Sequence, residues 1–272
     1  MASVDLAPVA IIGLGAIGGS LAKALVRSRV RVRAYATSAA DADGALRDGI
    51  DVANEIAGCV AGMPIVLIAV PVTAHGAVAD AVASAARDDA ILLHAASLQR
   101  VDAVGSAGRV IGTHPLAGTH RAGFAAADAD IFAGCTVSVE ARAGAGVRAT
   151  AERLWGAVGA RRFEYRTAEE HDRLMTWVSH LPQLASTALA DAIAGAGVEF
   201  DALGPGGRDA TRLAASPFEM WSGILAVARP EAARAAAALE RSVGALRSAL
   251  ESGDMQAVER IWTAARGWAE PR

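Results

Sequence analysis

Lysine is almost absent from this chain of 272 residues, in which Lys23 is the only one. Lysine therefore drops out as a catalytic base anywhere beyond the first expected helix, and arginine carries nearly all of the positive charge. The 26 basic and 29 acidic side chains give a net charge of −3. This balance gives no electrostatic reason to expect nucleic acid or an anionic membrane surface as a partner.

Cysteine and long apolar runs are also scarce. Cys59 and Cys135 have no CxxC or Cys/His spacing, so no metal site is expected, and two scattered thiols fit a reducing compartment. The longest apolar run, from Pro64 to Val72, is about half of a membrane span and indicates a buried strand instead. The first residues lack the charged and apolar regions of a signal peptide. We therefore expect a cytoplasmic protein.

Short runs rich in Val, Ile and Leu alternate with helical patterns over the first part of the chain. The central runs are nearly continuous in apolar residues, which is typical of parallel strands covered by helices on both faces. The expected strands are Val9–Gly13, Val30–Tyr35, Ile65–Val70, Ala90–His94, Val110–Thr113, Thr136–Val139 and Arg161–Tyr165. The alternation predicts an α/β fold with a doubly wound parallel sheet of the Rossmann type over residues 1–166.

The pattern changes to helices alone over residues 167–272, which we expect to form an all-α domain for substrate binding and dimerisation. A long helix bent at Pro182 should be followed by a break at residues 204–207. The expected helices are Thr167–Ala194, Asp209–Ala228, Glu231–Ser252 and Asp254–Trp268. Their wide apolar faces fit a monomeric bundle core or a dimer interface, and we favour a homodimer.

A glycine-rich turn follows the first expected strand and opens the first expected helix. In Gly13-Leu14-Gly15-Ala16-Ile17-Gly18, Gly13 permits a tight turn, Gly15 lets a pyrophosphate approach the backbone, and Gly18 lets the helix pack against the strand. The helix N-terminus supplies N–H groups to the phosphates. Ala16 and Ile17 should therefore contact a dinucleotide, together with Val70 and Pro71 at another strand end.

The choice between NAD and NADP depends on the end of the second strand. An acidic residue about 20 positions after the glycines would bind the ribose 2′-hydroxyl and select NAD. This chain has Thr37 and Ser38 there, whose hydroxyls suit a 2′-phosphate, with Arg33 or Arg47 as a source of charge. We expect NADP. NAD stays open, because Asp41 and Asp43 lie only a few residues further on.

Two polar segments follow later strands of the expected sheet. Ser97 comes after the strand ending at His94, and His114 lies at the end of the next strand. Ligands of open α/β sheets bind beyond the carboxyl ends of the strands, so both side chains should face the nicotinamide end of a cleft. A histidine there can accept the proton of an alcohol while hydride leaves the same carbon.

These features, taken with others in the second half, resemble the prephenate/arogenate dehydrogenase family of tyrosine biosynthesis. The matching segments run in the expected order over residues 9–225. They are Gly13–Ser20, Ser97, His114–Gly118, Glu170-His171-Asp172, Ser179-His180-Leu181-Pro182, Gly207–Arg212, Ser216-Pro217 and Met220-Trp221.

The resemblance implies oxidative decarboxylation of a cyclohexadienol, with hydride passing from C4 to nicotinamide while the ring carboxylate leaves as CO2. It implies that His114 accepts the proton of the C4 hydroxyl and that Ser97 orients this hydroxyl. Arg212 would bind a substrate carboxylate through its planar donor fork, and Asp209 would hold the guanidinium. Substrate and cofactor are the small-molecule partners that follow.

The chain departs from the family pattern at the expected substrate site. Gln183 stands where many prephenate-using members have histidine, and His120 and Arg121 stand where a glutamate is frequent. Gln183 and His120 remain substrate-binding candidates, but the choice between prephenate and arogenate stays open. His94-Ala95-Ala96 replaces the usual Asp-x-Gly before Ser97.

Three other functions compete with this one. A relative acting on an amino-substituted prephenate is compatible with the departures at Gln183 and His120. A β-hydroxyacid dehydrogenase is excluded because its catalytic lysine belongs to the helical domain, whereas Lys23 lies beside the glycine turn. A catalytically inactive NADP sensor would need none of Ser97, His114 and Arg212.

The remaining histidines give no metal site. His171 and His180 would lie on nearly opposite faces of one helix and cannot share an ion. We expect His171 with Asp172 to support a hinge between the domains, and His180 to be structural.

Overall fold

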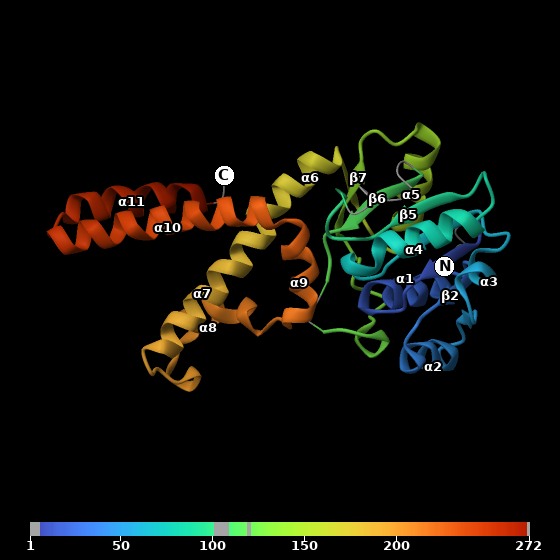
Figure 1. Ribbon diagram of the computed structural model, residues 1–272, viewed down its shortest axis with the longest axis horizontal. Coiled ribbons are helices and arrows are strands. Elements are labelled where there is room, and N and C mark those ends of the chain that lie inside the picture. The colour runs from blue at the N-terminus through green and yellow to red at the C-terminus, as the bar shows by residue number, and fades with distance from the viewer. Residues whose placement is uncertain (1–5, 101–108, 119–120, 271–272) are drawn as a thin grey trace. The chain divides into compact units, whose positions relative to one another are not determined.

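The computed structural model describes residues 6–100, 109–118 and 121–270 (Figure 1). The chain divides into two compact units. The first comprises Met1–Met175 with Ser216–Val227, and the second comprises Thr176–Ala215 with Ala228–Arg272. Each unit is described by itself below.

The first unit is built on an eight-stranded sheet with the order β3-β2-β1-β4-β5-β6-β7-β8. The strands are β1 (Val9–Ile12), β2 (Val32–Tyr35), β3 (Asp51–Val52), β4 (Ile65–Ile68), β5 (Ile91–His94), β6 (Val110–Pro115), β7 (Thr136–Glu140) and β8 (Arg162–Arg166). All pairs from β3 to β6 are parallel. The order reverses at β1, where the chain crosses from β3 to β4, and this is the doubly wound arrangement that the sequence predicts.

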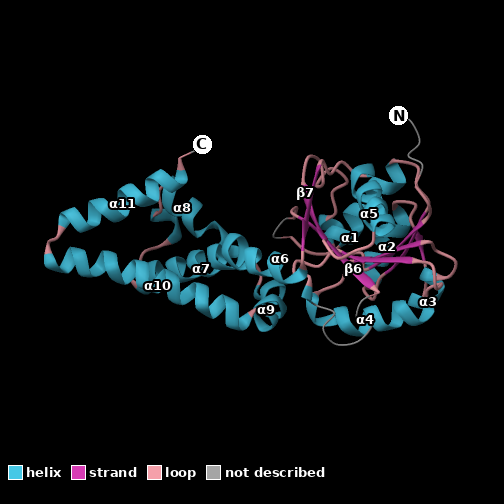
Figure 2. Cartoon of the chain, turned by 90° about the horizontal axis from the view of Figure 1, so that it is seen from above, coloured by secondary structure: helices cyan, strands magenta, loops and turns pink. Residues whose placement is uncertain are grey.

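Helices cover both faces of this sheet. The helices of this unit are α1 (Ala16–Arg27), α2 (Ala39–Arg47), α3 (Ile56–Val60), α4 (Val72–Ala85), α5 (Ala145–Ala157), α6 (Ala168–Met175) and α9 (Phe218–Val227), of which α9 packs against α4. Figure 2 shows α1 and α5 on one side of the strands and α3 and α4 on the other. Along β1, Val9 and Ile11 join one apolar core while Ala10 and Ile12 join the other. Burial on both faces explains why this strand is apolar throughout.

The sheet departs from the expected pattern at two strands. β7 runs antiparallel to β6, with His114 opposite Ser138. A parallel return needs a long crossover, usually a helix, but the described residues between these strands form only the short 3-10 turn η2 (Phe124–Ala126). The edge strand β3 has no counterpart among the expected strands, because Asp51–Val52 is too short and too polar to give a pattern.

The long helix expected over residues 167–194 is three elements. α6 ends at Met175, one turn of π-helix follows as η3 (Thr176–His180), and α7 covers Leu181–Gly195. Pro182 lies in the first turn of α7, where a proline is tolerated. Its missing N–H and its ring interrupt the hydrogen bonds of the preceding turn, which accounts for the wider π-turn there.

The second unit contains η3, α7 and the helical elements η4 (Phe200–Ala202), α8 (Pro205–Thr211), η5 (Arg212–Ala215), α10 (Arg229–Ser252) and α11 (Met255–Ala269). The break expected over residues 204–207 is wrong, because Gly204 caps α8 and Pro205 begins it. The helix expected over residues 209–228 is instead the end of α8, η5 and α9. None of the helices within residues 6–270 that are described has both the length and the apolar character needed to cross a membrane.

Candidate active site

The glycine turn after β1 has the geometry of a dinucleotide cradle. Gly13 has φ +102°, and a Cβ there would lie 2.4 Å from the carbonyl oxygen of Ala69. A Cβ on Gly18 would lie 1.9 Å from the oxygen of Gly13, so both positions require glycine. A Cβ on Gly15, in contrast, would meet nothing within 4 Å. The turn is therefore closed behind Gly13 and Gly18 and open in front of Gly15.

The N-terminus of α1 faces the same opening. Gly15 is its N-cap residue, no side chain caps the helix, and its first turn has no acidic residue. The first N–H groups, including those of Ala16 and Ile17, are thus left for an anion. Val70 contacts the turn, since its side chain would lie 3.0 Å from a Cβ on Gly13, and Pro71 caps α4 beside it. These residues fit the pyrophosphate of a dinucleotide.

The residues after β2 include the candidates for ribose recognition. Thr37 is exposed, and the hydroxyl of Ser38 caps α2 by accepting a 3.2 Å hydrogen bond from the N–H of Asp41. The carboxylate of Asp41 accepts a 2.7 Å hydrogen bond from the N–H of Phe124, so it is already engaged. Arg33 donates to Asp51 at 3.1 Å and to the carbonyl of Gly58 at 3.1 Å. These contacts tie Arg33 to the edge of the sheet.

Lys23 has a structural role in this unit. Its Nζ lies 3.1 Å from the carboxylate of Asp48, donates to the carbonyl of Ala127 and stands 4.5 Å from the centre of the Phe124 ring. The only lysine of the chain thus joins α1 to the end of α2 and to η2. This agrees with its exclusion as a catalytic base.

The candidate chemical residues lie at the carboxyl ends of two neighbouring parallel strands. β5 and β6 pair with His94 opposite Gly112, so the Ser97 loop and His114 both extend beyond this part of the sheet. Ser97 and His114 are half-buried. A Cβ on Gly112 would come within 3.0 Å of two side-chain carbons of Gln99, so this glycine leaves room for the loop after β5.

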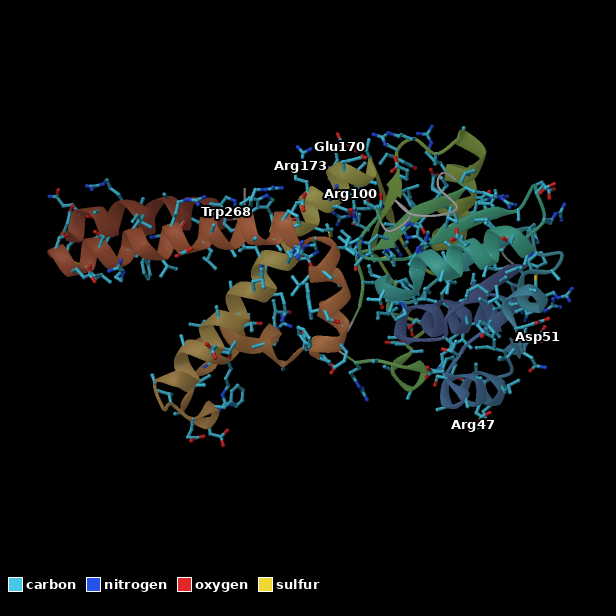
Figure 3. All side chains as sticks on the ribbon, in the orientation of Figure 1. Arg47, Asp51, Arg100, Glu170, Arg173 and Trp268 are labelled. Atoms are coloured by element: carbon cyan, nitrogen blue, oxygen red, sulfur yellow. The ribbon has the colours of Figure 1, made fainter. Side chains whose placement is uncertain are left out.

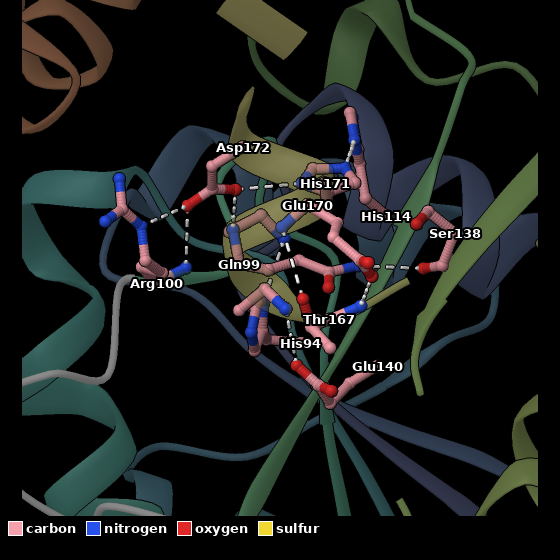
Figure 4. Close-up of polar contacts among 12 residues, drawn as sticks. His94, Gln99, Arg100, His114, Ser138, Glu140, Thr167, Glu170, His171 and Asp172 are labelled. Carbon is pink, nitrogen blue, oxygen red and sulfur yellow. Dashed lines mark hydrogen bonds and ion pairs between the residues drawn. The ribbon is translucent and has the colours of Figure 1, made fainter. Parts of the chain in front are cut away.

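His114 is the end of a chain of three side chains (Figure 4). Its Nδ1 lies 3.0 Å from Nε2 of His171, and Nδ1 of His171 lies 2.9 Å from Oδ1 of Asp172. The rings of the two histidines meet edge to face at 81°. His171 is fully buried, and Asp172 is buried as well. Since α6 belongs to the same compact unit as the sheet, all three side chains belong to one unit.

The carboxylate of Asp172 is surrounded by donors. It accepts hydrogen bonds from the backbone N–H groups of Gln99 at 2.8 Å and Arg100 at 3.1 Å, and from Nε of Arg100 at 3.2 Å. Burial on its own would raise the pKa of Asp172, but the hydrogen bonds from His171 and from these N–H groups outweigh it, so the pKa is lowered. Asp172 is therefore ionised at neutral pH.

The sequence does not predict the contact between His171 and His114, since His171 and Asp172 were expected to support a hinge between the domains. The two histidines are 57 residues apart, and no spacing rule joins them. The adjacent pair His171-Asp172 could have indicated this role, because an imidazole that donates to a carboxylate commonly orients a catalytic group.

The second unit holds the other candidates. Nε2 of Gln183 on α7 donates to the carbonyl of Leu213 at 2.9 Å, and the hydroxyl of Ser186 accepts from the N–H of Ala214 at 3.2 Å. These bonds hold η5, which begins with Arg212, against α7. Arg212 and Asp209 are both exposed, and among the described residues no ion pair joins them. His120 lies outside the described residues.

Comparison with known proteins agrees with this architecture. The family model described as "Prephenate dehydrogenase, nucleotide-binding domain" matches residues 21–162, and "Prephenate dehydrogenase, dimerization domain" matches residues 167–263. A cyclohexadienyl dehydrogenase from Zymomonas mobilis is 33% identical over 236 residues, which cover 80% of this chain and 79% of that protein.

Solved structures share the fold. A prephenate dehydrogenase from A. aeolicus, in complex with hydroxyphenyl propionate and NAD+, is 24% identical with a TM-score of 0.84, covering 98% of each chain. An arogenate dehydrogenase from Synechocystis is 19% identical with a TM-score of 0.79, covering 96% of this chain and 98% of the other. The two family models and the 33% identical cyclohexadienyl dehydrogenase, together with the glycine cradle before α1 and the histidine near the end of β6, show that the chain belongs to the prephenate dehydrogenase family.

Proposed function

We propose that this protein catalyses the NAD(P)-dependent oxidative decarboxylation of a cyclohexadienyl substrate, prephenate or arogenate, in tyrosine biosynthesis. The observation that carries the proposal is His114, which lies near the end of β6, beside the Ser97 loop, on the sheet that bears the dinucleotide cradle. Membership of the family and the likeness to a cyclohexadienyl dehydrogenase support it.

The residues have separable roles in the reaction. A nicotinamide dinucleotide, which Gly13, Gly15 and Gly18 would hold before α1, would supply the acceptor for the hydride that leaves C4 of the substrate. His114 accepts the proton of the C4 hydroxyl, and Ser97 orients this hydroxyl by a hydrogen bond. The bond from the ring to its carboxylate breaks, its electron pair enters the ring, and CO2 leaves. The ring is left as a phenolate, which takes the proton back from His114 to give a phenol. Its aromatisation makes the step effectively irreversible.

Arg212 is the proposed partner of a substrate carboxylate. Its guanidinium is exposed at the start of η5, a segment that Gln183 and Ser186 fix to α7. A planar fork of donors suits a carboxylate, and a fixed backbone reduces the entropy lost on binding. Asp209, on the preceding turn, and His120, which lies outside the described residues, are the other residues that we propose to bind the substrate.

Gln183 favours arogenate over prephenate as the substrate. Its amide NH2 group donates to the carbonyl of Leu213 at 2.9 Å and lies 3.3 Å from the hydroxyl of Thr187, so both of its hydrogens have acceptors. Its buried Oε1 accepts no hydrogen bond from the described residues. An acceptor suits the side-chain ammonium of arogenate, whereas the side-chain carbonyl of prephenate would need a donor.

The cofactor that we propose is NADP. No acidic side chain follows β2 before Asp41 in the first turn of α2, and Oδ1 of Asp41 already accepts a hydrogen bond from the N–H of Phe124. The hydroxyls of Thr37 and Ser38 and the first N–H groups of α2 can donate to a 2′-phosphate. Of the two arginines that could supply positive charge to this phosphate, Arg33 is paired with Asp51. Arg47 lies in the last turn of α2, at the other end of the helix from these N–H groups (Figure 3).

The proposed partner is a second copy of the chain. The helices α10 and α11 expose large apolar side chains two turns apart, and Trp268 projects from α11 (Figure 3). The exposed residues are Val243, Leu250, Met255, Trp262 and Trp268. A stripe of this kind is typical of a helical interface, and the family model that matches this part of the chain is described as a dimerization domain.

The experiment that tests the proposal follows the absorbance of the reduced cofactor. Purified protein is given prephenate or arogenate with NAD or NADP, and we expect the highest kcat/KM with arogenate and NADP. His114→Asn should lower kcat by at least about a hundredfold while the Kd for NADP is unchanged, because a positioned general base contributes this much. Absence of turnover with all four combinations would reject the function and favour a sensor.

A further inference from the structure

The side chains behind His114 define which of its two ring nitrogens carries a proton. The chain of contacts runs from Nδ1 of His114 to Nε2 of His171, and from Nδ1 of His171 to Asp172 (Figure 4). A hydrogen bond needs one donor and one acceptor, and two donors or two acceptors facing each other are unfavourable. The role of each ring nitrogen therefore follows from the role of the atom that it contacts.

The carboxylate sets the direction of the first link. Asp172 is ionised, and it also accepts from Gln99 and Arg100, so it acts only as an acceptor. Nδ1 of His171 must therefore carry a hydrogen and donate it to Oδ1 of Asp172. In the neutral form of the fully buried His171 ring, this hydrogen is the only one on nitrogen. A neutral His171 consequently presents a lone pair on Nε2.

The second link follows from the first. Because Nε2 of His171 is an acceptor, the atom 3.0 Å away, Nδ1 of His114, must carry a hydrogen. We propose that His171 and Asp172 are positioning residues that hold His114 in the Nδ1-protonated tautomer, so that Nε2 is the atom that takes the proton of the substrate hydroxyl. The tautomer itself follows from the contacts of His114, and only the identity of the hydroxyl that gives up its proton rests on the proposed function.

The same residues stabilise His114 after it has accepted the proton. An imidazolium at His114 donates from Nδ1 to His171, which in turn donates to an ionised carboxylate, so the new charge is met without rearrangement. The other charged groups at this place are Arg100, paired with Asp172, and Glu140 and Glu170, which accept from backbone N–H groups at the start of α6. Only Asp172 contacts His171 directly among these carboxylates.

Substitutions of His171 distinguish positioning from packing. His171→Gln places an amide oxygen where Nε2 was and keeps an acceptor for His114, whereas His171→Leu fills the space without one. We expect His171→Leu to lower kcat about 10- to 100-fold with KM within about twofold, and His171→Gln to recover most of kcat. Arg173→Ala, on the exposed side of the same helix, is the matched control and should keep the wild-type kcat.

Asp172→Asn tests the charge at the end of the chain. An amide can turn a donor toward His171 and reverse both links, so kcat should fall about 10²- to 10⁴-fold. The acid limb of the kcat/KM profile of the residual activity should move to lower pH by about one unit, because the carboxylate no longer favours protonated His114. The proposal would be overturned if Asp172→Asn lowered kcat without moving the acid limb of its kcat/KM profile. It would also be overturned if His171→Leu and His171→Gln lost the same fraction of kcat.

A spectroscopic measurement decides the same point without turnover. ¹⁵N NMR of wild-type protein labelled at histidine, at about pH 8 where histidines are neutral, reports which nitrogen carries hydrogen. The His114 signals are assigned by their loss in His114→Asn. We expect Nδ1–H on both His114 and His171. A hydrogen on Nε2 of His114 would overturn the proposal, even if the enzyme is active. If the expected hydrogens are found but the protein has no activity, the proposed reaction is rejected while the proposed tautomer of His114 stands.

Discussion

The backbone N–H of Gln99 donates a 2.8 Å hydrogen bond to Oδ1 of Asp172, which ties the loop after β5 to α6. Oδ2 of the same carboxylate accepts from the N–H of Arg100. One buried side chain thus holds the loop that bears Ser97 and orients the histidine pair that ends at His114. Positioning of the hydroxyl and of its proton acceptor therefore depends on a single ionised group.

Loss of this charge should destabilise the protein in a pH-dependent way. The folded-state pKa of Asp172 is lowered below its unfolded value, so its contribution is complete above about pH 4 and is lost as pH falls through the folded pKa. We expect Asp172→Asn to reduce the free energy of unfolding by about 1–3 kcal/mol at pH 7. Urea denaturation at pH 7 and pH 3 measures it, and the difference between variant and wild type should shrink at pH 3. A difference independent of pH would assign the loss to altered geometry.

The glycine cradle allows cofactor binding to be separated from folding. The Cβ added by Gly15→Ala has no atom within 4 Å, so the variant should fold with wild-type stability. The new methyl group would, however, occupy the space in front of α1 where the pyrophosphate should bind. We expect the Kd for NADP to rise at least about tenfold, which corresponds to about 1.4 kcal/mol. Gly146→Ala, also without close neighbours but in α5, is the control and should change neither quantity by much. Unchanged NADP binding in Gly15→Ala would contradict the cradle.

Gly13→Ala should behave differently from Gly15→Ala. It combines a positive φ with a contact of 2.4 Å to a backbone oxygen, so the strain should lower the melting temperature as well as cofactor binding.

Most of the sheet was predictable because its strands are buried on both faces. Continuous Val, Ile and Leu runs mark β1 and β4, and the glycine turn fixes where β1 ends. The direction of β7 was not predictable, since an antiparallel strand with buried neighbours has the same composition as a parallel one. The π-turn η3 was expected only as a bend, at Pro182 instead of before it.

The site was predictable where residues follow strands and not where distant segments meet. His114 and Ser97 could be identified because parallel strands end at a common edge. His171 could not be joined to His114, because their contact depends on how the first turn of α6 returns to the sheet after β8. The hydrogen bond from the N–H of Phe124 to Asp41 could not be predicted either, because it also joins segments that are far apart in the sequence.

Phe124 should make a large contribution to the stability of the first unit. Its ring is buried and fills the space left by Gly19 on α1 and Gly44 on α2, where added Cβ atoms would lie 2.7 and 2.8 Å from ring carbons. Phe124→Ala should lower the free energy of unfolding by about 3–5 kcal/mol through the cavity that it leaves. Phe218→Ala, at a residue that is 72% exposed, is the control and should cost little in chemical denaturation. Equal losses in the two variants would refute this packing role.

The apolar stripe of α11 gives a test of the proposed homodimer. Met255 and Trp262 lie two helical turns apart and are 61% and 71% exposed in the single chain, and no residue of α11 is buried. Leaving such a surface in water is unfavourable, at about 25 cal/mol for each Å² of apolar area, so a second copy that covers it gains this energy. Trp262→Arg should place a charge in the interface and shift sedimentation-velocity boundaries from dimer to monomer at micromolar concentration. Arg260→Ala, two residues before Trp262 and therefore on the opposite side of the same helix, should leave the wild-type boundary unchanged. A dimer that persists in Trp262→Arg would place the interface on another face of the chain.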